Sequence, residues 1–215
     1  TLVTHSDLTV CLDADISNIT KYAMRDYKSY DDAHHFFYIN RFPVFRGYTF
    51  NFINRHNYWT YLQDNLDAGE IVYITCENKG ETWWSMKKPS CKGIHYHLKD
   101  AGYEGIAIHQ DSSHQYKEIL ENPNGVLPGL IEGTSKLCKK YRIKKLQYLI
   151  TSPTLETGWS CGLQGEEHTF TKTFGLFPGN PRKHYTVHSI RQAVRRARAV
   201  KDHYIYINQK DKAPR

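Results

Sequence analysis

Four arginines gather near the carboxyl end of the sequence, in a segment whose residue types suit phosphate binding. They lie between residues 189 and 201, together with one glutamine: Arg191, Gln192, Arg195, Arg196 and Arg198. The segment is predicted to be helical, which would place all five side chains within about two turns. Because like charges at this spacing repel, the cluster favours an anion opposite it. A guanidinium group grips phosphate through a planar fork, so the cluster indicates a polyphosphate or a nucleic-acid backbone.

A second segment with phosphate-binding character, residues 151–160, reads TSPTLETGWS. It follows directly on a predicted strand, residues 146–150. Small hydroxylated side chains can donate to a phosphate without crowding it, and Gly158 would let the main chain approach a ligand closely. Taken alone, the segment is also typical of a Ser/Thr/Pro turn. Its place between a strand and the downstream arginine helix favours the phosphate-binding interpretation.

Strands and helices alternate along most of the chain, which predicts an α/β fold. A mostly parallel sheet covered by helices on both faces is expected. In such sheets ligands bind beyond the carboxyl ends of the strands, so the loops after Cys76, His109, Ile150 and Phe174 are the expected functional sites. The predicted strands are residues 8–12, 35–40, 47–54, 70–76, 105–109, 146–150, 169–174 and 203–208, and the predicted helices are residues 17–27, 57–67, 94–101, 115–121, 136–141 and 189–201.

Composition narrows the class of protein. The formal net charge of +7 favours nucleic acid or another polyanion as the partner. No run of about 18 apolar residues exists, so no membrane-spanning helix is predicted, and no signal-peptide pattern is present. The chain is therefore expected inside the cell, in the cytoplasm or nucleus, rather than secreted. The five cysteines include no CxxC pair and predict buried, reduced thiols; no metal site is expected.

Together, these two segments resemble the C-terminal RecA-like lobe of superfamily 2 helicases. The segment TSPTLETGWS looks like motif V, and QAVRRAR looks like motif VI, with Arg195 where many relatives have glycine and Arg198 one residue nearer than usual. The DADIS segment beginning at Asp13 is similar to one in replicative helicases of plasmids and viruses. The resemblance implies a RecA-like domain over residues 46–215, preceded by an interlobe or edge segment over residues 1–45.

The resemblance also implies roles for individual residues. Arg196 would be the arginine finger on the γ-phosphate of ATP, Arg198 a second catalytic arginine and Gln192 a phosphate-orienting or lobe-linking group. Near the nucleotide and the interlobe cleft it places Thr157, Gly158 and Arg195. Single-stranded DNA would be contacted by Ser152, Thr154, Asn78, Lys79 and Trp159. On this interpretation Ser152, Gly158, Gln192 and Arg196 should lie along one edge of the sheet.

No GxxxxGK[ST] sequence occurs, so the phosphate-cradling loop is missing from this chain. The resemblance therefore implies an N-terminal RecA-like lobe of the same protein, which would hold most of the ATP and Mg²⁺; this fragment alone is expected to be inactive. Two alternatives stay open. One is a primase-polymerase-like nucleotidyltransferase that uses Asp13, Asp15 and His95. The other is a non-catalytic nucleic-acid-binding module. A basic run over residues 136–145 is predicted to be a solvated helix and turn, or else a phosphate-tracking surface.

Overall fold

A computed structural model describes residues 47–76, 90–152, 159–162, 170–179 and 187–209. The chain divides into two units, Thr1–Val44 and Phe45–Arg215, and all the described residues belong to the second. Elements predicted before Gly47 lie outside the described residues. No described helix is long and apolar enough to cross a membrane.

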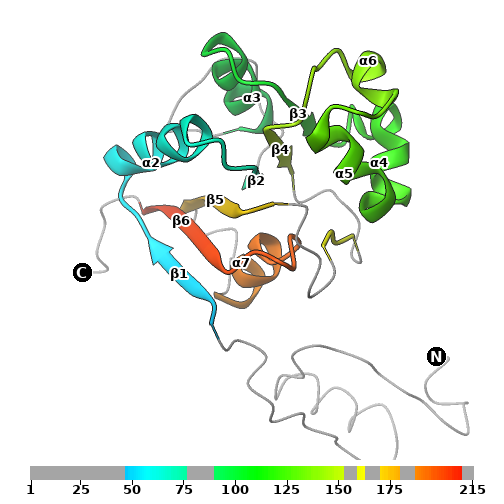
Figure 1. The fold of residues 1–215 in the computed structure, drawn as a ribbon. Helices are drawn as coiled ribbons and strands as arrows, with labels where there is room; N and C mark the ends of the chain where they lie inside the picture. Colours follow the sequence, from blue (N-terminus) through cyan, green and yellow to red (C-terminus); the bar gives the residue numbers. More distant parts are fainter. Residues whose placement is uncertain (1–46, 77–89, 153–158, 163–169, 180–186, 210–215) are drawn as a thin grey trace, which may run out of the picture. The chain divides into compact units, whose positions relative to one another are not determined.

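In the described part of the chain, six parallel strands form a single sheet in the order β1-β6-β5-β2-β4-β3 (Figure 1). Parallel neighbours need crossover connections, and helices supply most of them here. This arrangement confirms the predicted α/β fold and is consistent with a RecA-like type. The strands are β1 (Thr49–Phe52), β2 (Val72–Cys76), β3 (Gly105–Ile108), β4 (Tyr148–Thr151), β5 (Lys172–Gly179) and β6 (Asp202–Gln209).

One face of the sheet is covered by α2 (Arg55–Asp67) and α3 (Cys91–Asp100). Each helix begins at a side-chain cap: Asn54 accepts from the Asn57 amide, and Ser90 accepts from the Gly93 amide. Alternate residues of the strands meet these helices in a continuous core that includes Leu62, Ile94, Ile74, Ile150 and Phe174.

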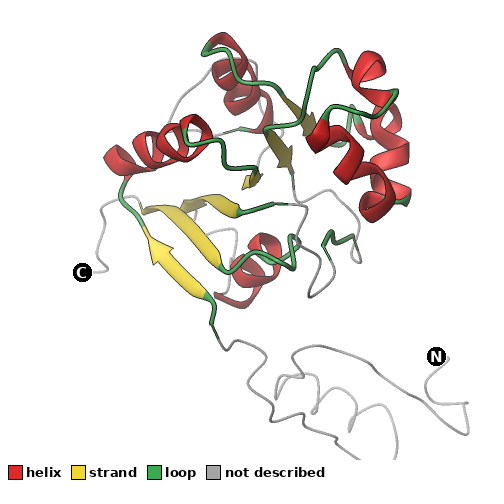
Figure 2. Ribbon diagram, viewed as in Figure 1, coloured by secondary structure: helices red, strands yellow, loops and turns green. Residues whose placement is uncertain are grey.

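The other face is covered by helices that follow β3 and β5, so helices lie on both sides of the strands (Figure 2). After β3 come a 3₁₀ turn, α4 (Lys117–Glu121), α5 (Pro123–Glu132) and α6 (Leu137–Tyr141). After β5 comes α7 (Val187–Val194), which packs Ile190 and Val194 against Phe177 and Ile205.

Two predicted elements differ from the structure, and one helix was not predicted. The arginine helix, predicted over residues 189–201, ends at Val194, so Arg195, Arg196 and Arg198 lie in the turn that leads to β6. Strand β5 extends to Gly179, so Phe174 lies within the strand and the loop predicted directly after Phe174 does not form there. Helix α5 was not predicted at all.

Candidate functional site

The TSPTLETGWS segment begins at the carboxyl end of β4, where its first two residues are buried. Thr151 is 1% exposed and Ser152 is 3% exposed. The Thr151 hydroxyl lies 2.6 Å from the Tyr73 hydroxyl, and the Ser152 amide donates to the Ile108 carbonyl at 3.1 Å. The start of the segment is therefore fixed to both neighbouring strands, β2 and β3.

Several predicted site residues lie outside the described residues: Thr154, Thr157, Gly158, Asn78, Lys79, Asp13 and Asp15. Of the nucleotidyltransferase alternative, the structure describes His95 only. Its Nδ1 lies 3.1 Å from the Tyr148 hydroxyl, and burial lowers its pKa to about 4. No group of three His, Cys, Asp or Glu residues in the described ranges is arranged to hold a metal ion.

Trp159, predicted to contact nucleic acid, is half-buried on the α4–α5 side of the sheet. Its ring stacks on that of Tyr73, with centroids 6.1 Å apart, and its indole N–H donates to the Ile119 carbonyl at 3.3 Å. These contacts direct much of the indole into the core. Cys161 and Gly162 follow in the chain. The Gly162 amide donates to the Asn124 side-chain oxygen at 2.9 Å.

The arginine segment pairs directly with Cys161, the residue that follows the TSPTLETGWS segment. The Cys161 amide donates to the Arg196 carbonyl at 2.8 Å, and the Arg198 amide donates to the Cys161 carbonyl at 2.8 Å. Ala197, between the two arginines, forms a parallel bridge with Cys161 and is buried. The main chain therefore holds Cys161, directly after the segment that resembles motif V, beside the segment that resembles motif VI.

Tyr73 links the arginine segment electrostatically to the end of β4. Tyr73 is the second residue of β2, and its ring runs along the sheet so that its hydroxyl reaches Thr151. Burial raises the pKa of Tyr73, while the Thr151 hydroxyl and the positive charge of Arg196 act in the opposite direction. Arg196 is half-buried. Its charge therefore acts on the group that fixes Thr151.

Arg195, the residue before Arg196, lies near the start of the edge strand β1. The Arg195 guanidinium lies 4.9 Å from the centre of the Tyr48 ring, and that of Arg191 lies 5.8 Å from the Phe50 ring. Both rings stack on His203, whose Nδ1 lies 2.5 Å from the Thr173 hydroxyl. Burial first, and then the charge of Arg195, lower the pKa of His203 to about 4.

Gln192 and Arg198 are exposed to solvent. The expected common edge is wrong for two main-chain positions: Ser152 follows the carboxyl end of β4, whereas Arg196 comes before Asp202, the first residue of β6. Tyr73 and Cys161, which connect these positions, were not predicted as site residues. A tyrosine within a buried strand and an isolated cysteine carry no local signal that distinguishes them from ordinary core residues.

We compared the chain with protein-family models, with curated proteins and with solved structures, and none of the three comparisons gave a match.

Proposed function

We propose that this chain is the C-terminal motor lobe of an ATP-dependent nucleic-acid helicase that acts in DNA replication inside the cell. In this proposal Arg196 and Arg198 act on the phosphates of ATP, Gln192 orients them, and Arg195 lies nearby with Thr157 and Gly158. Single-stranded DNA is contacted by the segment after β4. An N-terminal RecA-like lobe of the same protein holds most of the ATP and its Mg²⁺.

The observation that carries the proposal is the main-chain pairing of Cys161 with Arg196 and Arg198. Cys161 directly follows one segment that resembles a helicase motif, and Arg196 and Arg198 belong to the other. A non-catalytic basic module would need the arginines to be exposed, but would not need them to be pinned to the segment after β4. The pairing favours a motor lobe for this reason.

The chemistry suits the side chains that the structure presents. In phosphoryl transfer negative charge spreads over the γ-phosphate oxygens, and a planar cation delivered from a second lobe stabilises it. Arg196 is half-buried, which strengthens its electrostatic effect, and Arg198 is exposed and can reach a partner lobe. The main-chain atoms of both residues are fixed by Cys161, so the backbone that carries the two side chains is ordered before a phosphate binds.

The test is the ATPase activity of the full-length protein, with and without single-stranded DNA. We expect Arg196→Ala to lower the DNA-stimulated turnover by about 10³-fold or more, the usual contribution of an arginine finger. Because Cys161 pairs with main-chain atoms of residue 196, the substitution leaves that pairing in place. Lys99→Ala, an exposed lysine on α3, is the control and should retain full activity. Wild-type activity in Arg196→Ala, or no ATPase in the full-length protein, would refute the proposal.

A further inference from the structure

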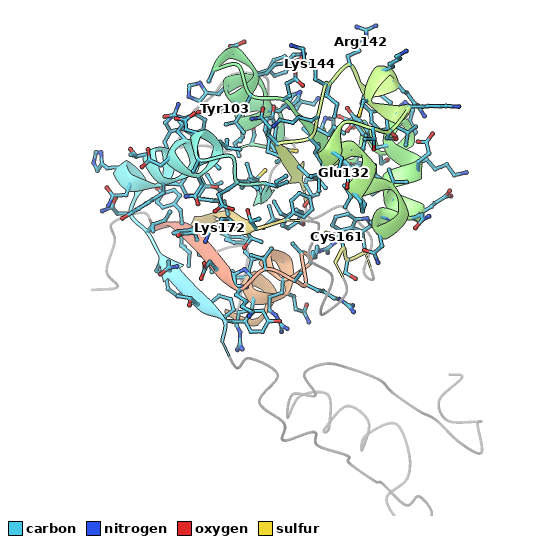
Figure 3. All side chains as sticks on the ribbon, viewed as in Figure 1. Tyr103, Glu132, Arg142, Lys144, Cys161 and Lys172 are labelled. Atoms are coloured by element: carbon cyan, nitrogen blue, oxygen red, sulfur yellow. The ribbon has the colours of Figure 1, made fainter. Side chains whose placement is uncertain are left out.

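A second basic surface lies on α6 and the turn that follows it. We call it the α6 basic surface and define it by six exposed cations within ten residues: Lys136, Lys139, Lys140, Arg142, Lys144 and Lys145. None of them belongs to the arginine segment or to the segment after β4. Figure 3 shows Arg142 and Lys144 extending from the same outer side of the molecule.

Most of this charge has no internal counter-charge. Lys140 pairs with Glu118, and that carboxylate also accepts from the Tyr141 hydroxyl. The bond from Lys140 first, and then that from Tyr141, lower the pKa of Glu118 to about 2. The other five cations form no ion pair with any acidic side chain in the described part of the chain. Lys136, the N-cap residue of α6, and Lys139 are three residues apart, a spacing at which like charges repel. An anion on this surface would relieve that repulsion.

The main chain beneath the cations is rigid. Arg142 adopts a left-handed conformation, with φ at +57°, and is the only described non-glycine residue with positive φ. The Arg142 amide donates to the Lys139 carbonyl, and the Ile143 amide donates to the Cys138 carbonyl. The amides of Lys144 and Lys145 both donate to the Glu104 carboxylate, which lies on the sheet side of the turn. The cations are therefore displayed on a preorganised frame.

From these features we propose that the α6 basic surface binds the phosphate backbone of nucleic acid, separately from the segment after β4. Five uncompensated cations on a fixed frame can neutralise several phosphates, and such contacts hold a strand without reading its sequence. Turns that precede β4 lie at the amino end of the sheet, whereas Ser152 lies at the carboxyl end. The surface gives the domain a second grip on nucleic acid and goes beyond the proposed motor function.

An exposed acidic residue, Glu132, borders the surface, and removing its charge should strengthen nucleic-acid binding rather than weaken it. A hollow of about 440 Å³ is lined by Gly102, Glu104, Glu132, Gly133, Lys144, Lys145 and Gln147. The Glu104 carboxylate is occupied by two amides, but Glu132 is exposed on the last turn of α5. A carboxylate there repels phosphate and is also unfavourable at the helix C-terminus, so its removal should not destabilise the fold.

The experiment is a titration of the full chain with a labelled single strand and a labelled duplex, at salt concentrations between about 50 and 200 mM. We expect Lys139→Gln/Lys144→Gln to weaken duplex binding about 25-fold near 0.15 M salt, because each lost phosphate contact costs about 5-fold. The slope of log K against log salt should fall in magnitude by about 1.8. Glu132→Gln should tighten binding. The single strand is expected to respond in the same direction with smaller changes.

The control is Lys99→Gln/Lys201→Gln, which removes the same net charge from two exposed lysines, one on α3 and one before β6. Equal affinity and equal salt slope for the two double variants would overturn the proposal, as would a Glu132→Gln variant that binds no more tightly than the wild type. A double variant that failed to fold, as judged by thermal unfolding, would leave the Glu132→Gln result to decide. The unstimulated ATPase of the full-length protein should be unchanged in Lys139→Gln/Lys144→Gln, so failure here is distinguishable from failure of the motor proposal.

Discussion

The buried hydrogen bond between Tyr73 and Thr151 can be tested with a double-mutant cycle. Both residues are almost fully buried, and their hydroxyl oxygens lie 2.6 Å apart at the point where the TSPTLETGWS segment begins. Tyr73→Phe removes one hydroxyl and keeps the ring that stacks on Trp159 and contacts Phe170. Thr151→Val removes the other hydroxyl and keeps its shape.

The magnitude follows from what each change leaves unpaired. Tyr73→Phe leaves a buried threonine hydroxyl without its partner, which should lower the free energy of unfolding by about 1–3 kcal/mol. Thr151→Val should cost less, because the Thr75 hydroxyl also interacts with Tyr73. The double variant leaves neither of these two hydroxyls orphaned. Its loss should therefore be smaller than the sum of the two single losses by about 1–2 kcal/mol.

The assay is urea denaturation of the wild type, the two single variants and the double variant, followed by tryptophan fluorescence and circular dichroism. The coupling energy is read from the differences in unfolding free energy at constant denaturant slope. Strict additivity of the two single losses would show that the hydrogen bond does not stabilise the fold, and this reasoning would be refuted.

Two further outcomes are expected from the packing beneath α7. First, the folded-state pKa of His203, at about 4, lies below its ordinary value of 6.5, so the unfolded chain binds more protons than the folded one between these pH values. The free energy of unfolding should therefore fall as the pH drops from about 6.5 to about 4, by at most about 1.4 kcal/mol per pH unit from this group. The measurement is denaturation at a series of pH values, in which His203→Phe/Thr173→Val should show a weaker dependence of stability on pH. Second, a Cβ at Gly175 would lie 2.6 Å from Phe177 and 2.9 Å from Val194, so Gly175→Ala should destabilise the domain by about 1–3 kcal/mol through overpacking; an unchanged melting temperature would contradict this packing.

Local signals were sufficient for most strands. The run Ile71-Val-Tyr-Ile-Thr-Cys76 is β-branched and apolar, and all five residues of β2 are buried. Gly69 ends the preceding helix with φ at +81°, as expected of a glycine at that position. These elements were predictable because each residue's own preference agrees with its place in the fold.

Helix α5 was missed because its local composition argues against a helix. The stretch Pro123–Glu132 contains two prolines and two glycines, of which Pro128 lies inside the helix. Tertiary contacts override that preference: Leu127 and Leu130 are fully buried, and the Asn122 side chain caps the first turn. Strand β5 was predicted to end at Phe174, but it continues through Pro178 and Gly179, residue types that are rare in central strands. They lie beyond Leu176, the last residue of β5 that pairs with β2, so the proline does not interrupt that ladder.

The early end of α7 has a non-local cause that bears on the proposed mechanism. Residues 195–200 are alanine, arginine and valine, and most of them favour a helix. In a continued helix the Arg198 amide would donate to Val194, and the Arg196 carbonyl would accept from Val200. Both groups instead bond Cys161, which is 35 residues away from Arg196 in sequence. A displacement of the connection after β4 must therefore move the arginines with it. In the proposed motor, the connection after β4 contacts the nucleic-acid strand. The main-chain pairing with Cys161 would then couple that contact to the position of Arg196 at the nucleotide.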